Sequence, residues 1–319
     1  MKRLTAIITY VLLSVAAVIA SFSLLTVTAR SAYAHEYSRD DGDSRVINET
    51  HPIKADGEVR VDNLAGNVKV RGWDRNEVRI TGELSPSADH LQVDTDANGI
   101  SIRVVLPHDS GHYEDDEGSD LVIDMPRGAY LNVSTVSADV TVADVNGQQS
   151  YDTVSGTITL TSTSTRIEAK SVSGDVTVTG SGPKAKVSAS SISGTVTVTS
   201  MDGMLEASSI SGEVNASNNK LNAATLSSTS GDLRFDGTLQ KGGDYEFHNV
   251  SGDVEVTVGS SPSARFDVSS FSGDIHNSFG PKPTRVSKYS PGEELRFTNG
   301  SGDAQVTIRT LSGDIRLED

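Results

Sequence analysis

The chain has 319 residues, no cysteine and a formal net charge of −16. This excess of carboxylates disfavours nucleic acids and anionic lipid surfaces as partners. The lack of cysteine excludes disulfides, thiol catalysis, zinc–thiolate sites and iron–sulfur clusters. Stability must therefore come from apolar burial and from backbone hydrogen bonding.

Residues 1–34 have the composition of a secretory signal peptide. Two basic residues precede an apolar run from Leu4 to about Val27, and an Ala-Tyr-Ala sequence ends at Ala34, where a signal peptidase would cut. An uncleaved anchor is the alternative, because the run is nearly long enough to span a bilayer. With cleavage we expect an exported protein, periplasmic or extracellular at the cell surface, that does not insert into the membrane. Residues 35–52 are then a flexible polar leader.

Residues 53–135 show the alternation of short β-strands. Pairs of aliphatic residues such as Val59 and Val61 are spaced two apart, and glycines separate the pairs. This segment lacks the regular step found further along the chain. We interpret it as an irregular N-terminal β region, either the start of the same array or a cap over its first coil.

Residues 136–319 repeat a Ser-Gly step nine times, usually after an aliphatic residue and before an acid or Thr, and the further pair Ser181-Gly182 lies outside this series. Successive pairs are 18, 20, 18, 19, 21, 21, 29 and 11 residues apart. Repeats of this size cannot bury an apolar face alone and must stack on one another. The pattern predicts an all-β, elongated β-solenoid, β-helix-like or β-roll-like, with repeats of about 18–21 residues. The 29-residue interval contains three prolines and predicts an inserted loop at about 278–294.

The glycine of each pair is expected at a corner between two strands. Glycine adopts a positive φ without steric cost, which we take as the reason for its recurrence. The predicted structural corners are Gly156, Gly174, Gly194, Gly212, Gly231, Gly252, Gly273, Gly302 and Gly313.

Two parts of the sequence carry a family resemblance. The stretch Asn63–Val70, with Trp73-Asp74 shortly after it, resembles the opening of a bacterial family of exported β-strand-repeat proteins named as putative adhesins. Aliphatic-Ser-Gly-Asp-aliphatic steps such as Val172–Val176 and Leu311–Ile315 resemble the repeats of that family. The resemblance covers about residues 53–317 and implies an envelope-associated protein without an assigned catalytic residue or cofactor.

Acidic residues supply the candidate metal ligands. The segment 108–117 gathers two imidazoles and several carboxylates, and its alternative is a solvated acidic loop. Its candidate ligands, which the sequence supports only weakly, are His108, Asp109, His112, Asp115 and Asp116. The acids after Ser-Gly could form a column that collects calcium, or each could hydrogen-bond its own turn, which we favour. These acids are Asp175, Asp232, Asp253, Asp274, Asp303 and Asp314.

No motif in the sequence points to catalysis. The chain lacks a nucleophile elbow, a phosphate loop, a dinucleotide fingerprint and a His-Glu-x-x-His motif. We therefore predict a non-enzymatic envelope protein without a cofactor, an adhesin or binding scaffold whose partner is an unknown envelope protein or glycan. The alternatives are a polysaccharide-acting β-helix lyase or hydrolase, and a calcium-binding structural β-roll. The sequence leaves the oligomeric state and any signalling role open.

Overall fold

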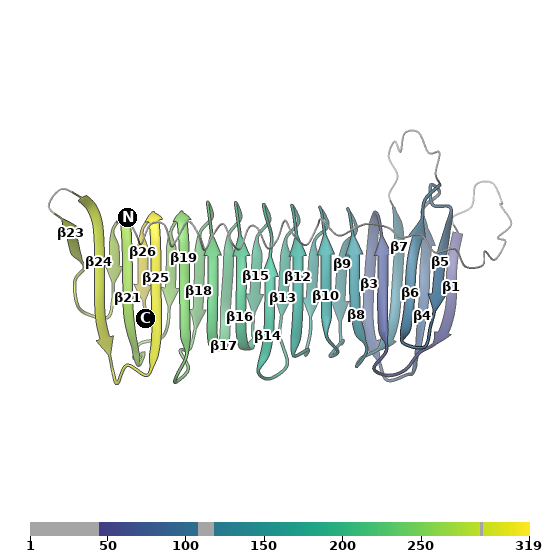
Figure 1. Cartoon of the computed structure of the whole chain (residues 1–319), viewed down its shortest axis with the longest axis horizontal. Helices are drawn as coiled ribbons and strands as arrows, with labels where there is room; N and C mark the ends of the chain where they lie inside the picture. Colours follow the sequence, from purple (N-terminus) through teal and green to yellow (C-terminus); the bar gives the residue numbers. More distant parts are fainter. Residues whose placement is uncertain (1–44, 108–117, 288–289) are drawn as a thin grey trace.

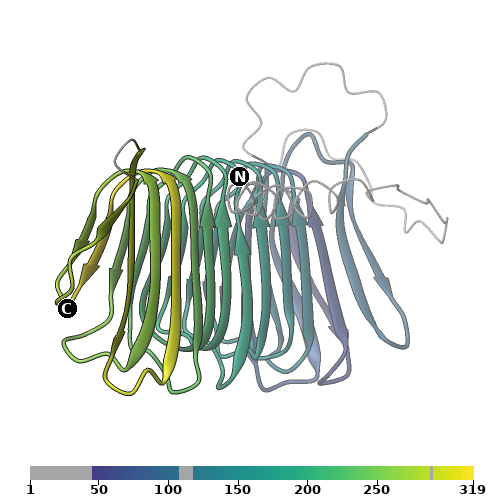
Figure 2. The ribbon, with the colours of Figure 1, turned by 60° about the vertical axis from the view of Figure 1, so that its left-hand side comes forward.

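The computed structural model describes residues 45–107, 118–287 and 290–319. These residues form 26 β-strands and, within the described ranges, no helix, so the predicted all-β class is confirmed. The strands stack into an elongated body whose successive coils lie side by side (Figure 1). Figure 2 shows the same coils turned by 60°, with the C-terminal end brought forward.

Each regular coil contributes one strand to each of two mainly parallel sheets. In spatial order, sheet A contains β1 (Arg45–Pro52), β4 (Glu77–Leu84), β7 (Ser119–Pro126), β3 (Gly66–Trp73), β9 (Asp139–Ala143), β11 (Ile158–Thr161), β13 (Val176–Thr179), β15 (Val196–Thr199), the start of β17 (Val214–Ser228), β18 (Leu233–Gly237), β20 (Val254–Thr257), β26 (Ile315–Glu318) and β22 (Ile275–Asn277).

Sheet B is built in the same way from the other strand of each coil. In spatial order it contains β5 (His90–Thr95), β6 (Gly99–Val105), β2 (Glu58–Asn63), β8 (Tyr130–Thr135), β10 (Gln149–Thr153), β12 (Arg166–Ser171), β14 (Ala185–Ser190), β16 (Asp202–Ser209), the end of β17, β19 (Asp244–Ser251), β25 (Ala304–Ser312), β21 (Ala264–Ser272), β24 (Ser290–Asn299) and β23 (Thr284–Ser287).

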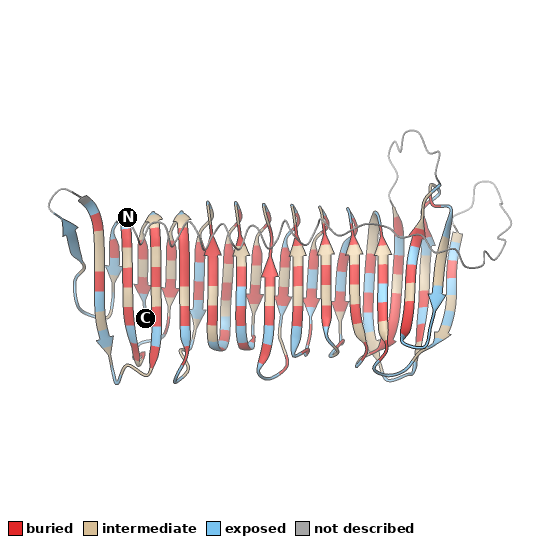
Figure 3. Cartoon of the chain, viewed as in Figure 1, coloured by how far each residue is buried: buried red, intermediate tan, exposed pale blue. Residues whose placement is uncertain are grey.

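The core lies between the two sheets and follows directly from the alternation in the sequence. Along β13 the residues Val176 and Val178 are fully buried, while Thr177 and Thr179 point outward. Figure 3 shows this alternation of buried and exposed residues along one strand after another. Equivalent residues lie directly beside each other in neighbouring coils, so each coil extends the same apolar columns.

The core changes in composition along the stack. In the middle coils sheet B contributes small side chains, among them Ala189. Towards the C-terminal end aromatic rings replace them. Phe235 packs against Phe247 with ring centroids 5.2 Å apart, and Phe266 stacks on Phe297 at 4.7 Å. Large aromatic side chains fill more space between the sheets than Ala and Val do, so the core at this end is built from fewer, larger side chains.

The spatial order of the coils departs from the chain order at both ends. The last coil, β25–β26, pairs with β19–β20 on one side and with β21–β22 on the other. At the other end β2–β3 lies between β6–β7 and β8–β9. The first and last parallel coils of the chain are therefore held on both sides. Chain ends usually fray unless they are held in this way.

Antiparallel strands close both ends of the stack. At the N-terminal end β1 and β4 extend sheet A and β5 extends sheet B. The expectation of a flexible leader is wrong for Arg45–Pro52, because this segment is β1 and is held by backbone pairing with β4. At the C-terminal end β24 pairs with β21, and β23 pairs with β24. The segment expected as an inserted loop at about 278–294 contains β23 and the start of β24, so it contributes to this cap. Caps of this kind protect the open edges of a parallel stack from pairing with other chains.

Candidate functional site

Eight of the nine predicted Ser-Gly corners lie in one row along the edge where sheet B turns into sheet A. A Cβ added to Gly194 would lie 2.2 Å from the carbonyl oxygen of Gly174, and one added to Gly212 would lie 2.0 Å from that of Gly194. The same approach recurs from Gly156 to Gly273, with Gly313 between Gly252 and Gly273. Each of these glycines therefore contacts the backbone of the next coil, and no side chain fits between them.

Positive φ is the wrong explanation for most of these glycines. Gly252, Gly273, Gly302 and Gly313 have a positive φ, but the other five predicted corners do not. Those five are Gly156, Gly174, Gly194, Gly212 and Gly231. Glycine is needed there because a Cβ would collide with the neighbouring carbonyl. Gly302 differs in another way, since it lies in the turn between β24 and β25 and not in the row of stacked glycines.

A buried hydroxyl or amide lies three residues before each stacked glycine. The Ser191 hydroxyl accepts the Gly194 N–H at 2.9 Å and donates to the Gly174 carbonyl at 3.0 Å. Ser209 repeats both bonds one coil further on. The members of this column are Thr153, Ser171, Ser191, Ser209, Ser228, Asn249, Thr310 and Ser270. Our sequence analysis missed them, although a polar residue three before the glycine was a visible signal.

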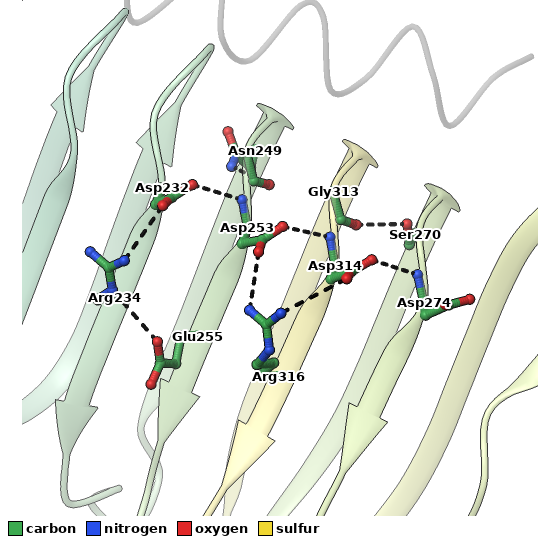
Figure 4. Close-up of polar contacts among 11 residues, drawn as sticks. Asp232, Arg234, Asn249, Asp253, Glu255, Ser270, Asp274, Gly313, Asp314 and Arg316 are labelled. Carbon is green, nitrogen blue, oxygen red and sulfur yellow. Dashed lines mark hydrogen bonds and ion pairs between the residues drawn. The ribbon is translucent and has the colours of Figure 1, made fainter.

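The acids that follow the glycines form a ladder on the outer side of the corner (Figure 4). Asp232 Oδ1 accepts the N–H of Asp253 at 2.9 Å, and Asp253 Oδ1 accepts that of Asp314 at 2.9 Å. Asp314 Oδ1 in turn accepts the N–H of Asp274 at 3.0 Å. Asp253 and Asp314 are 61 residues apart in the chain. The ladder thus joins coils through carboxylates and backbone amides.

The expectation that each Asp bonds its own turn is wrong for most of this ladder. Asp139 and Asp175 also bind the next coil, through the N–H groups of Thr157 and Thr195. Asp303 alone bonds within its own turn, accepting the Ser301 hydroxyl at 2.6 Å. A sequence shows that the acids recur, but only stacking decides which amide each one meets.

Two arginines offset part of the negative charge of the ladder. Arg316 contacts Asp253 at 3.0 Å and Asp314 at 3.9 Å, and Arg234 lies between Glu213, Asp232 and Glu255. The N–H of Asp314, and then Arg316, hold the pKa of Asp253 below its usual value. The ionised carboxylates are therefore supported by amides and guanidinium groups. The described residues contain no group of three or more metal-ligating side chains.

The metal-ligand candidates of the sequence belong to the segment 108–117. His108, Asp109, His112, Asp115 and Asp116 lie outside the described residues, so the metal hypothesis for this segment stays a prediction.

Trp73 stands at the N-terminal end of sheet A, where its indole N–H donates to the Glu77 carbonyl at 2.9 Å. The guanidinium carbons of Arg75 and Arg79 lie 4.9 and 5.4 Å from the centroid of its ring.

A shallow depression of about 300 Å³ lies near the C-terminal cap, with Arg265 and Asp303 in its lining. Beside it, the hydroxyls of Ser263 and Ser301 lie 2.9 Å apart, and both contact Asp303. These hydrogen bonds lower the pKa of Asp303, with the bond from Ser301 the larger cause. A carboxylate stabilised in its ionised form is a weaker general base, so these hydrogen bonds reduce the ability of Asp303 to activate either serine.

The outer face of sheet A carries threonines in register across the middle coils. Two columns run side by side, one along β9, β11, β13 and β15 and the other along β11, β13 and β15, with each residue directly beside its equivalent in the next coil. The first column is Thr141, Thr159, Thr177 and Thr197, and the second is Thr161, Thr179 and Thr199. Lys69 lies beside Thr141 at one end, and Asn215 lies beside Thr197 at the other.

This lattice presents hydroxyls at regular spacings. Neighbouring coils repeat at about 4.8 Å, and two residues along a strand span about 6.6 Å. All seven threonines are exposed or half-buried. Each hydroxyl can donate one hydrogen bond and accept two, so the face is neutral and uniformly polar. Such a surface can make many equivalent weak contacts with a polar polymer.

Fold and surface together define an all-β protein of stacked coils with a polar outer lattice. The family model described as Toastrack DUF4097 matches residues 46–226 and 210–318. The chain therefore belongs to the Toastrack DUF4097 family, which confirms the resemblance drawn from its opening and its Ser-Gly-Asp steps. None of the curated proteins compared with the chain matches it.

Solved structures give further similarities. The chain is similar to a "putative adhesin" from Bacteroides fragilis at 15% identity, with 86% of this chain and 97% of that chain covered and a TM-score of 0.47. A "putative adhesin" from Parabacteroides distasonis is similar at 12% identity, with 86% and 98% covered and a TM-score of 0.44. A "putative lipid binding protein" from the same species is similar at 12% identity, with 88% and 98% covered and a TM-score of 0.45.

Within the residues that the structure describes, no helix has the length and hydropathy needed to cross a bilayer.

Proposed function

We propose that this protein is a non-enzymatic binding scaffold of the bacterial envelope, which holds glycan chains on the outer face of sheet A. The observation that carries the proposal is the double column of threonines, stacked in register over consecutive coils. A glycan chain also presents hydroxyls at short regular intervals, so it can lie along the lattice and bond several coils at once. Many weak contacts then give binding without a deep pocket.

The sequence supports the cellular setting of this role. The signal-peptide composition of residues 1–34 supports a location outside the cytoplasm, in the periplasm or at the cell surface. A chain without cysteines needs no oxidising machinery to fold there, because the ladder of backbone and side-chain hydrogen bonds links each coil to the next.

A glycan array tests the proposal. The full chain is applied to immobilised bacterial envelope polysaccharides, and the retained glycans are then offered to the variant T159V/T177V/T197V. Valine keeps the branched shape of threonine on the strand but removes the hydroxyl, so the fold is kept while binding falls. The matched control is S150A/S188A, which removes outward hydroxyls from sheet B. If no glycan is retained, or if the valine variant binds as well as the unchanged chain, the proposal is wrong.

A further inference from the structure

One residue per coil points outward at the corner just before the exposed Ser of each Ser-Gly pair. In the coil of β10, Tyr151 and Thr153 face the core, so Val154 faces outward by alternation. Hydrogen bonds from Ser155 to the Val136 carbonyl and from Ser173 to the Val154 carbonyl place these residues side by side. The corner ridge consists, in spatial order, of Leu64, Val136, Val154, Val172, Ile192, Ile210, Thr229, Val250, Leu311 and Phe271.

The corner ridge is apolar but does not belong to the core. Leu64 and Val136 are each 41% exposed and Phe271 is 58% exposed, while the remaining members are half-buried. Among the described residues, the partly buried hydrophobic side chains that pack against the core do not include any member of the ridge. Thr229 shows that a polar residue is compatible with this position in the fold. Apolar residues at nine of ten successive corners are therefore more than this position requires, and a line of exposed and half-buried apolar side chains of this kind is a candidate binding surface.

The shape of the corner ridge restricts what can cover it. It is one side chain wide, and ten coils at a spacing of about 4.8 Å give it a length of about 43 Å. A flat membrane or a globular face is far wider than this stripe and would also cover the polar surface on both sides of it. An α-helix with one apolar seam is also a narrow line, and about 29 residues at 1.5 Å per residue have the same length. Its turns repeat every 5.4 Å, close to the spacing of the coils.

The charge beside the corner ridge defines the partner further. The position three residues after each ridge residue, on the sheet A side, carries an acid in most coils. These acids are Asp139, Asp175, Glu213, Asp232, Asp253, Asp314 and Asp274. Arg234 and Arg316 reach only part of this column. On the other flank, the residue two before each ridge member is serine or histidine in six coils, and the charges of the remaining four cancel, since Asp62 and Asp152 are acidic while Lys170 and Arg309 are basic. The complement of an apolar line with carboxylates along one side is an apolar seam with cations along one side.

We propose that the corner ridge binds a basic amphipathic polypeptide segment, a helix of about 25–30 residues whose apolar seam lies on the ridge and whose Lys or Arg side chains face the acid column. A second copy of this chain fits less well, because two ridges in contact would bring two acid columns together in a protein of net charge −16. The site deepens the proposed binding role but lies on the corner and not on the threonine face. Glycan retention and peptide binding can therefore fail separately.

The test uses the full chain and a synthetic 28-residue helical peptide with a leucine seam and lysines along one flank. A second peptide carries glutamate in place of lysine. Binding is followed by fluorescence anisotropy at several salt concentrations. The ridge variant is V172S/I192S/I210S, with M204S as a control that removes an exposed apolar residue elsewhere. The charge variant is D175N/E213Q/D232N, with E168Q/D202N/E206Q on sheet B as its control for net charge.

We expect the lysine peptide to bind and the glutamate peptide not to bind. The ridge variant should weaken binding on the order of tenfold or more, because three apolar contacts are lost. The charge variant should weaken binding and reduce its salt dependence, because screened ion pairs are removed. Asn keeps the oxygen that accepts the next coil's N–H, so the charge variant stays folded. Both controls should bind as the unchanged chain does, and all variants should retain glycan.

Three results would overturn the inference. Equal binding of the two peptides would show that charge plays no part. Unchanged affinity in the ridge variant, with its melting temperature intact, would place the peptide elsewhere. A dimer in sedimentation that the ridge variant abolishes, and that excludes the peptide, would make a second copy the occupant.

Discussion

Replacing Gly194 by alanine tests why glycine recurs at the corners. The added Cβ would lie 2.2 Å from the Gly174 carbonyl oxygen and 2.9 Å from the Ser191 hydroxyl. Ordinary contacts to a Cβ begin near 3.4 Å. The coils must therefore separate locally by about 1 Å, in a stack whose spacing of about 4.8 Å is set by backbone hydrogen bonds. Overpacking of this kind costs about 3 kcal/mol, and the Gly194 N–H bond to Ser191 weakens as well.

A glycine with positive φ and open surroundings supplies the control. Gly259 has a φ of 75°, and a Cβ there would meet no atom of the described residues within 4 Å. Its replacement by alanine costs only the left-handed backbone penalty, about 1 kcal/mol. Both variants are unfolded in urea and followed by circular dichroism, and the midpoints are compared. The steric argument is refuted if Gly194→Ala is no less stable than Gly259→Ala, because a conformational role for glycine would give that order.

Three further predictions concern the ladders and the order of coils. Ser191→Ala removes a buried hydroxyl that serves both Gly194 and Gly174, and should cost about 2 kcal/mol in thermal or urea unfolding. Ser191→Thr keeps the hydroxyl, as Thr153 does two members away in the column, and should cost less. Equal losses in the two variants would contradict the role of the hydrogen bonds. Asp253→Asn should lower stability at pH 7 but not at low pH. The folded pKa of Asp253 is depressed, so its contribution to the free energy of unfolding is present above the unfolded pKa of 3.8 and is lost as the pH falls through the folded pKa. The free energies of unfolding of Asp253→Asn and of the unchanged chain should converge as the pH is lowered from 7. A constant difference between them would count against the Asp314 N–H and Arg316 as the cause of the depressed pKa. Removal of residues 304–319 should expose the edges of β19 and β21 together, and the shortened chain should aggregate, as measured by sedimentation. A soluble, shortened stack would show that the last coil is not needed between its two neighbours.

The regular coils were predictable because the sequence signal is local. Alternation in stretches such as Val176–Thr179 sets which side chains face the core, and a recurring Ser-Gly marks where each strand turns. The role of the stacked glycines was not predictable in the same way. Gly156 and Gly194 read as turn glycines, yet they lack a positive φ and are needed because a neighbouring carbonyl occupies the space of a Cβ. That carbonyl comes from another coil.

The two candidate binding surfaces, the threonine lattice and the corner ridge, also differ in how much of each could be predicted from the sequence. The threonines of the outer lattice were recognisable as outward residues from their place in the alternation, as with Thr177 and Thr197. The aliphatic residue before each Ser-Gly was also visible in the sequence. Its outward direction was not, because a corner interrupts the alternation and an aliphatic residue there could equally close the core. The acid column was expected only as one alternative, and its amide partners lie in other coils.

The sequence by itself determined the all-β class, the apolar and polar faces of each strand and the position of the corners, because these depend on residues within one coil. Tertiary structure alone decided which coils are neighbours. The coil containing Gly313 lies between those of Gly252 and Gly273. The first coil of the chain, β2–β3, lies between β6–β7 and β8–β9. Parallel strands pair through backbone groups that every residue shares, so pairing carries little sequence information. The caps, the packing of side chains and the fit of each coil's ends select one order from several.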